Sequence, residues 1–255
     1  MPVEKLLSGK TIIVTGGSRG IGRDTCRVLG RHGANVVVNY AASEEKALRT
    51  VKEVEEAGGK AIAVAGDVRE AETWERMTQL AVETFGGLDG IVNNAISGKQ
   101  DGAFDDASDE DYRTAFEFGC LAVANSIRAA KPHFAASGGG RIVNIVTEVW
   151  NQAGPNWSVY LAGKGAMVGM SRSLANELGP EGITVNMVAP GWMATDKVDT
   201  TSEGSQKFAQ SLPLRRHGSG EEIGKACVFF LSELGDYVTG AYLPVTGGRV
   251  NQMGG

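Results

Sequence analysis

The segment TIIVTGGSRGIG, residues 11–22, joins a run of apolar residues to a glycine-rich turn and to the start of an amphipathic stretch. Glycines let a backbone turn tightly and let a ligand approach it closely, and the N-terminus of a helix that follows such a turn attracts anions. The glycine spacing differs from the common GxGxxG pattern, so this is a variant of the dinucleotide-binding fingerprint. An ordinary glycine-rich turn is the alternative, but the position between a strand and a helix favours nucleotide binding.

Short apolar runs rich in Val and Ile alternate with longer amphipathic stretches along the rest of the chain. This alternation predicts an α/β fold, a doubly wound parallel sheet of about seven strands with helices on both faces. The predicted strands are 11–16, 34–40, 60–68, 88–95, 140–147, 182–190 and 240–248. The predicted helices are 20–32, 43–57, 70–85, 108–135, 158–179 and 220–234.

No linker or internal repeat divides the 255 residues, so we expect a single domain, 1–255. Residues 191–219 lack a strand pattern and follow the end of a strand. Long loops at such positions often cover a binding site, which makes 191–219 a candidate substrate lid.

The composition bounds the classes of function. The net charge is −5 and no basic run stands out, which argues against a nucleic-acid partner. The three cysteines contain no CxxC pair and the three histidines are scattered, so we expect a reducing compartment and no metal site. No segment reaches the ~18 apolar residues of a membrane helix, and the first residues do not resemble a signal peptide. We therefore expect a cytoplasmic protein without a membrane partner.

The end of the second predicted strand bears on the choice of nucleotide. An acidic residue there would bind the ribose hydroxyls of NAD and repel a 2′-phosphate, but the sequence has Asn39 and Tyr40. Arg19, in the glycine-rich turn, is suited to meet a phosphate, although a solvated loop arginine is the alternative. These residues predict a preference for NADP(H), with NAD(H) as the second candidate.

Three further motifs follow predicted strands: GDV (66–68), NNA (93–95) and PGWMATD (190–196). The carboxyl ends of parallel strands are where such sheets bind ligands. Asp67 could equally cap the next helix, and the third motif could be a plain exit loop.

The segment YLAGK, residues 160–164, opens a predicted helix. Tyr160 and Lys164 are four residues apart and therefore share one face of that helix. Taken alone, such a pair is more often a surface feature than a phenol held beside an ammonium.

In their order and spacing, TGGSRGIG, GDV, NNA, YLAGK and APGWMATD resemble the short-chain dehydrogenase/reductase family over essentially the whole chain. VVVNYAASEEKA and GITVNMVAPG look most like the branch of 3-oxoacyl-acyl-carrier-protein reductases and related carbonyl reductases. The resemblance implies a Rossmann fold and an NADPH-dependent oxidoreductase that reduces a carbonyl to a secondary alcohol. Its substrate would be a small carbonyl compound, with acyl thioesters among the candidates, and relatives are commonly homotetramers built on the helices near 108–135 and 158–179.

By the same resemblance, Tyr160 is the general acid. Lys164 binds the nicotinamide ribose and lowers the pKa of the tyrosine. Thr147, thirteen residues before Tyr160, stands where the family usually has serine to hold the substrate oxygen. Threonine keeps the hydroxyl donor but adds a methyl group and a stiff χ1.

The resemblance also implies a set of nucleotide contacts: Gly16, Ser18, Arg19, Gly20, Ile21, Asn39, Tyr40, Ser43, Asp67, Val68, Asn94, Ala95, Tyr160, Lys164, Pro190, Gly191, Met193 and Thr195. Candidate substrate contacts are Ile96, Trp150 and Trp192, for which aromatic or apolar core packing is the alternative.

Two further positions depart from the family pattern. Ile96 replaces a glycine and places a branched side chain beside the expected nucleotide, and Gly119 replaces an asparagine that helps to organise a proton-relaying water. Glycine keeps its carbonyl but loosens a helix. A second hypothesis is therefore a nucleotide-binding homologue with little or no catalysis and a regulatory or scaffolding role, although the presence of Tyr160 and Lys164 argues against it.

Overall fold

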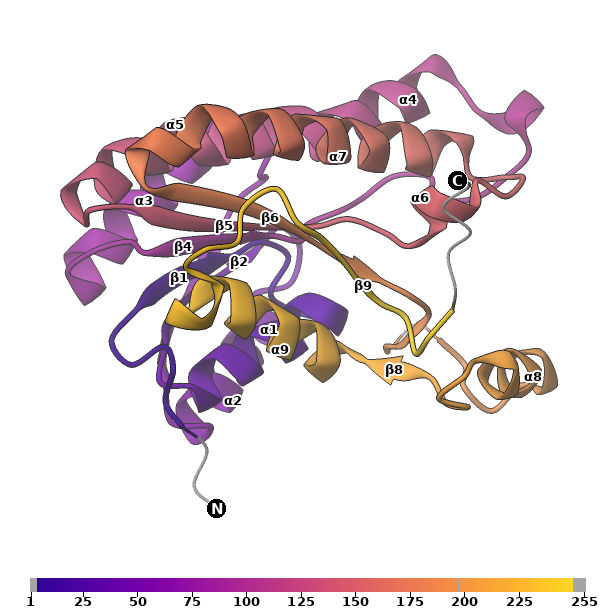
Figure 1. Ribbon diagram of the computed structural model, residues 1–255, viewed down its shortest axis with the longest axis horizontal. Helices are drawn as coiled ribbons and strands as arrows, with labels where there is room; N and C mark the ends of the chain where they lie inside the picture. Colours follow the sequence, from indigo (N-terminus) through magenta and orange to yellow (C-terminus); the bar gives the residue numbers. More distant parts are fainter. Residues whose placement is uncertain (1–3, 197, 250–255) are drawn as a thin grey trace.

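The computed structural model describes residues 4–196 and 198–249, and its centre is a seven-stranded parallel sheet (Figure 1). The strand order is β3-β2-β1-β4-β5-β6-β9. The strands are β1 (Thr11–Val14), β2 (Asn35–Tyr40), β3 (Lys60–Ala65), β4 (Gly90–Asn93), β5 (Gly140–Ile145), β6 (Ile183–Pro190) and β9 (Tyr242–Val245). The predicted Rossmann-type α/β fold is confirmed.

The direction of winding reverses between β1 and β4. From β1 the chain proceeds through β2 to β3 at one edge, and it then returns to β4 on the other side of β1. Val14 of β1 pairs with Val38 on one side and with Val92 on the other. The connections that leave β1 and β4 therefore diverge, which creates a crevice at the carboxyl ends of these two strands.

Helices cover both faces of the sheet (Figure 1). One layer contains α1 (Gly20–Arg31), α2 (Glu44–Glu56) and α9 (Gly220–Leu231); the other contains α3 (Ala71–Phe85), α4 (Asp109–Phe116), α5 (Ala122–Ala136) and α7 (Ser158–Leu178). Successive strand residues point to opposite faces, so Ile12 packs in one core cluster and Ile13 in the other. This burial on both sides explains why the strands read as continuous apolar runs.

Side chains cap some of the helices at their N-termini. A capping box is present at Ser108, with Asp111 as its partner, and Ser43 caps α2 by accepting a hydrogen bond from the backbone N–H of Lys46. The N-cap of α3 is Glu70, so Asp67 does not cap that helix.

The predicted helix 108–135 is divided into three parts. A π-helical turn, η2 (Glu117–Leu121), separates α4 from α5. Within 191–219, where the sequence shows no strand pattern, β7 (Met193–Ala194) pairs with β8 (Gly218–Ser219). The segment also contains α8 (Glu203–Ser211), and two-residue strands are too short to leave a periodic pattern. The remaining short elements are α6 (Val149–Gln152), η1 (Phe104–Asp106), η3 (Gly179–Glu181) and η4 (Glu233–Gly235).

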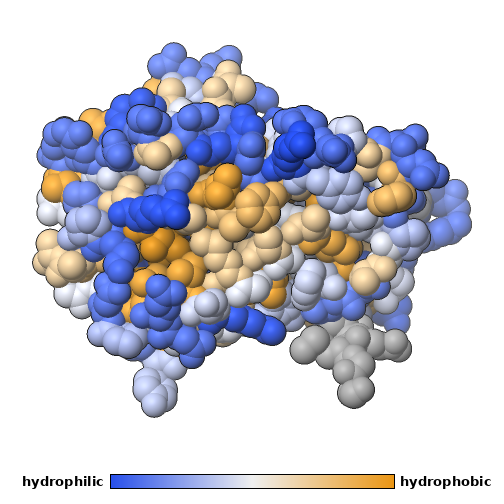
Figure 2. All heavy atoms as spheres, turned by 90° about the horizontal axis from the view of Figure 1, so that it is seen from above, coloured by the Kyte–Doolittle hydropathy of each residue, from blue (hydrophilic) through white to orange (hydrophobic). Residues whose placement is uncertain are grey.

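Figure 2 views the face formed by α4, α5 and α7, where apolar residues gather along the middle between charged borders. Phe116 and Leu121 are exposed on this face. Subunit contact through these helices stays a prediction. Among the residues that the structure describes, no helix is both long and apolar enough to span a bilayer.

Candidate active site

The glycine-rich turn forms an open cradle at the start of α1. Gly16 and Gly20 have φ of 62° and 52°, in the left-handed region that favours glycine. A side chain on Gly22 would overlap the carbonyl oxygen of Gly16, whereas a Cβ on Gly20 would meet only Thr195, at 3.9 Å. The space beside the Gly20 backbone, between Gly20 and Thr195, is therefore not filled by other side chains in the described part of the chain.

The first turn of α1 is suited to an anion. Its N-cap, Arg19, makes no side-chain capping bond, and the turn contains no acidic residue. Free N–H groups at a helix start bind phosphate well, so the cradle fits the diphosphate of a dinucleotide. Arg19 itself is exposed beside it.

Two asparagines support this cradle from within the protein. The buried side chain of Asn39 accepts a hydrogen bond from Gly16 N (3.3 Å) and donates one to Gly66 O (3.0 Å). Asn94 donates to Thr15 O (2.8 Å). These side chains join the turn after β1 to the ends of β3 and β4, so the side-chain atoms of Asn39 are directed inward.

Tyr40 marks the end of β2, and its phenol contacts the carboxylate of Glu44 in the first turn of α2. Partial burial and this carboxylate both raise the pKa of Tyr40. An acid thus lies close to the end of β2. The pattern at the end of the strand does not reveal this acid, because Glu44 lies beyond the strand, in the first turn of α2.

Asp67 forms an ion pair with Arg69, a residue that the sequence motifs did not indicate. Its carboxylate forms an ion pair with Arg69 (2.7 Å), and hydrogen bonding to Arg69 lowers the pKa of Asp67. Arg69 also pairs with Glu117 (2.9 Å) and lies 5.2 Å from the ring centre of Phe118. The turn after β3 is thereby tied to η2, while Val68 is buried in the core.

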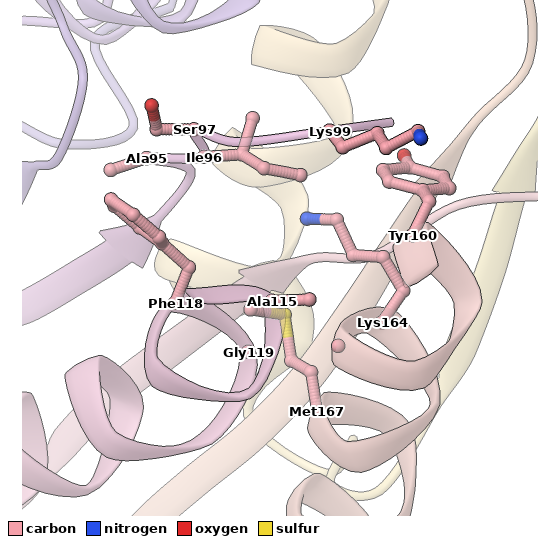
Figure 3. Close-up of a pocket in the computed structure, with 11 residues that line it drawn as sticks. Ala95, Ile96, Ser97, Lys99, Ala115, Phe118, Gly119, Tyr160, Lys164 and Met167 are labelled. Carbon is pink, nitrogen blue, oxygen red and sulfur yellow. The ribbon is translucent and has the colours of Figure 1, made fainter. Parts of the chain in front are cut away.

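Tyr160 and Lys164 extend from α7 into one pocket (Figure 3). The Lys164 side chain is buried, and its ammonium donates a hydrogen bond to Ile145 O at 2.5 Å. Burial lowers the pKa of Lys164 to about 8. The other lining residues are Ala95, Ile96, Ser97, Lys99, Ala115, Phe118, Gly119, Gly163 and Met167.

The pKa of Tyr160 is raised, chiefly because the phenol is buried. The Thr147 hydroxyl is close enough to oppose this rise, and the Glu148 carboxylate adds to it. The Lys164 ammonium is directed to the Ile145 carbonyl in this arrangement. The lowering of the phenol pKa by Lys164, which the family resemblance implies, stays a prediction.

Thr147 lies in a turn that follows β5, at the carboxyl edge of the sheet. Its side chain is buried, and its Oγ1 accepts a hydrogen bond from Val149 N (3.2 Å). Tyr242 of β9 donates from its hydroxyl to Thr147 O (2.8 Å), and Asn151 donates to that same hydroxyl (3.2 Å). Burial raises the pKa of Tyr242 to about 12. The turn is thus fixed by a strand from the far part of the chain.

The remaining predicted nucleotide contacts lie after β6. Pro190 ends that strand, and Gly191 donates to Val245 O (2.9 Å). Met193 is buried in β7, while Thr195 faces Gly20 across the cradle. The structure therefore brings this loop to the same edge of the sheet as the glycine-rich turn.

The candidate substrate residues fall in different surroundings. Ile96 is partly exposed and lines the pocket with Tyr160, as predicted for a residue beside the site. Trp192 packs on Phe208 of α8, with ring centres 4.6 Å apart. Trp150 lies against Gly165 on α7 and is not among the residues that line the pocket of Figure 3. Trp150 is 41% exposed, so its role as a substrate contact stays a prediction.

Known proteins match nearly the whole chain. The family model described as enoyl-(acyl carrier protein) reductase matches residues 16–249. An uncharacterized oxidoreductase of Methylorubrum extorquens is 38% identical over 247 residues, which are 95% of this chain and 98% of that protein. The 3-oxoacyl-(acyl-carrier-protein) reductase FabG of Staphylococcus aureus is 35% identical over 240 residues, covering 94% and 97%. A crystal structure of a short chain dehydrogenase from Burkholderia cenocepacia in complex with NADP superimposes with a TM-score of 0.86 at 32% identity, covering 95% and 98%.

Proposed function

The chain belongs to the short-chain dehydrogenase/reductase family, and on that premise we propose that it reduces a ketone to a secondary alcohol with NADPH, using Tyr160 as the general acid. The observation that carries this proposal is the convergence of three side chains beside the glycine cradle. Tyr160 and Lys164 share a pocket, and Thr147 lies close enough to influence the Tyr160 phenol.

The nucleotide would be held by residues at the carboxyl edge of the sheet. The open N–H groups of the first turn of α1 would bind the diphosphate, and Arg19 would bind the 2′-phosphate of NADPH. Bound NADPH supplies the hydride. The NADP complex of the Burkholderia cenocepacia relative supports this cofactor, whereas Glu44 beside Tyr40 is a feature that would weaken the preference.

Tyr160 would give its proton to the substrate oxygen as the carbonyl carbon is reduced. The pKa of its phenol is raised, so the phenol is protonated at neutral pH and ready to donate. Thr147 would donate a second hydrogen bond to the same oxygen and stabilise the charge that develops there.

Lys164 would act beneath the phenol. Its ammonium can hold the ribose hydroxyls of the nucleotide once it turns away from Ile145 O. With a pKa of about 8, Lys164 can also exchange a proton close to neutral pH, which would help to restore the proton that Tyr160 gives up.

For the substrate, we propose a 3-oxoacyl thioester or a related small ketone. The support is the 35% identity with the Staphylococcus aureus reductase over almost the full length of both chains. The pocket walls contributed by Ile96, Phe118 and Met167 are apolar, which suits the carbon chain of such a substrate.

The test is the oxidation of NADPH and of NADH, followed by absorbance, against a panel of 3-oxoacyl thioesters, 3-oxo esters, cyclic ketones and aldehydes. The control is the Tyr160→Phe protein, which retains the fold and lacks the proton donor. Turnover that depends on Tyr160 supports the proposal. NADPH binding without any turnover above that control would instead support a nucleotide-binding homologue without catalysis.

A further inference from the structure

Glu148 is a buried acid in the turn after β5 that also contains Thr147, here called the catalytic turn. It follows Thr147, and its side chain is only 3% exposed. One carboxylate oxygen accepts a hydrogen bond from Arg249 (3.2 Å), and the other accepts one from Gln152. A carboxylate that is removed from water and has no charged partner destabilises the folded protein. This position therefore requires a cation. Arg249 is its only ion-pair partner in the part of the chain that the structure describes.

Arg249 reaches this acid from the segment after β9. Its guanidinium also lies 5.4 Å from the ring centre of Phe208 on α8. Phe208 in turn packs on Trp192, in the loop that follows β6. One partly exposed arginine therefore contacts both the catalytic turn and the helix of the candidate lid.

We propose that Arg249 is a positioning residue for the reaction, which holds the Thr147–Glu148 turn against α8 and neutralises Glu148 so that its charge does not act fully on Tyr160. This inference rests on the proposed roles of Thr147 and Tyr160. It assigns to Arg249 a function that goes beyond packing on Phe208.

The charges around Glu148 support this role. Arg249 faces it from the segment after β9, Tyr242 from β9, Tyr160 from α7 and Gln152 from α6. Burial raises the pKa of Glu148 and Arg249 opposes that rise. The Glu148 carboxylate raises the pKa of both Tyr160 and Tyr242, and this effect grows when the partner cation is removed.

A merely structural role for Arg249 leads to a different expectation. If Arg249 only packs on Phe208, then Arg249→Met should act by loosening α8, and the identity of residue 148 should not alter the effect. If Arg249 acts through Glu148, the two substitutions should be strongly coupled.

The experiment compares Arg249→Met, Arg249→Lys, Glu148→Gln and the double variant Arg249→Met/Glu148→Gln. The matched control is Arg141→Met, because Arg141 is the second residue of β5, the strand that leads to Glu148, and it pairs with Asp236 away from the candidate site. The measurements are kcat/KM for the best carbonyl substrate across pH, the Kd of NADPH, and the phenolate absorbance of each protein during an alkaline titration, with Tyr160→Phe subtracted.

We expect Arg249→Met to lower kcat/KM about tenfold, the kind of loss that a small displacement of a catalytic group produces, with the Kd of NADPH unchanged. The alkaline limb of the pH profile of kcat/KM and the phenolate titration of Tyr160 should both move to higher pH. Glu148→Gln should move them to lower pH, and the double variant should behave like Glu148→Gln alone, because Arg249 then has no carboxylate to neutralise. Arg249→Lys should retain most activity.

Equal behaviour of Arg249→Met and Arg141→Met, or additive effects of Arg249→Met and Glu148→Gln, would overturn the proposal. The phenolate titration requires no turnover, so it tests the Arg249 inference even if the carbonyl panel fails. If Arg249→Met does not fold, the opposite shift expected of Glu148→Gln and the retention expected of Arg249→Lys still decide the question.

Discussion

Gly119 of η2 and Gly163 of α7 lie so close together that neither position has room for a side chain. A Cβ at Gly119 would overlap the carbonyl oxygen of Gly163, and a Cβ at Gly163 would overlap that of Ala115. The glycine at 119 is therefore part of a close contact between helices, at the wall of the pocket that contains Lys164.

This contact predicts that Gly119→Ala destabilises the protein by about 1–3 kcal/mol, the range for overpacking a well-packed site. Urea unfolding measures the change. The control is Gly169→Ala on α7, which has no atom within 4 Å of the added Cβ and should gain up to about 1 kcal/mol from helix propensity. If the two variants have equal free energies of unfolding, α7 can shift to make room for the added methyl group without destabilising the protein.

Tyr160→Phe should lower kcat by about 10²–10⁴-fold, the usual contribution of a positioned general acid. The Kd of NADPH should hardly change, because the ring remains and only the proton donor is lost. Lys164→Ala should weaken both turnover and NADPH binding. Near-normal kcat in Tyr160→Phe would mean that another group donates the proton.

Thr147→Ser should keep or raise activity, because it keeps the hydroxyl and removes the methyl group. Thr147→Val keeps the branched shape but loses the donor, and it should lower kcat/KM by roughly 10²-fold, or about 2.7 kcal/mol. The Val variant also leaves Val149 N without its acceptor, so its unfolding free energy must be measured in parallel. If Thr147→Val has the same kcat/KM as wild type on a good substrate, the role of Thr147 is packing alone.

Tyr40→Asp should move cofactor preference from NADPH towards NADH, since a carboxylate at the end of β2 repels the 2′-phosphate. Glu44→Gln, which removes a carboxylate from beside the Tyr40 phenol, should move preference in the opposite direction. The ratio of kcat/KM for the two cofactors tests both. A wild-type preference for NADH would refute the assignment.

Lys164→Met should stabilise the protein at neutral pH, and this advantage should disappear at alkaline pH. The pKa of Lys164 is about 8 when folded and 10.5 in its ordinary environment, so below pH 8 the folded state bears the cost of a buried charge. That cost is about 3 kcal/mol, and it is lost as the pH rises from 8 to 10.5, where the unfolded chain binds more protons. Unfolding free energies at several pH values check the sign, with Met167→Leu in the same pocket as the control for packing.

The sequence predicted the elements whose signals are local. Strands buried on both faces left long apolar runs, so their positions could be predicted from the sequence. It did not predict η2, which forms where two glycines from distant segments touch, or the β7–β8 pair, which is too short to have a period.

In the candidate site, the residues carried by motifs lie together, but their electrostatic partners were missed. Arg69, Tyr242 and Arg249 act through tertiary contacts that no spacing reveals. The bond between the Lys164 ammonium and Ile145 O could not be predicted either, because a helical spacing of four places Lys164 on the same face as Tyr160 without showing what its ammonium contacts.

The bonds that fix the catalytic turn have a consequence for the order in which the site is completed during synthesis. Thr147 O is bonded by a residue 95 positions later, and Glu148 by one 101 positions later. At a translation rate of ~5–20 residues per second, the turn waits about 5–20 s for these partners after it leaves the ribosome. The strands that flank the nucleotide crevice, β1 and β4, precede it. The nascent chain can therefore form the glycine-rich turn and the strands beside it well before the turn at Thr147 is fixed. The part of the site that would face the diphosphate thus exists earlier in the life of each molecule than the part that would act on the substrate.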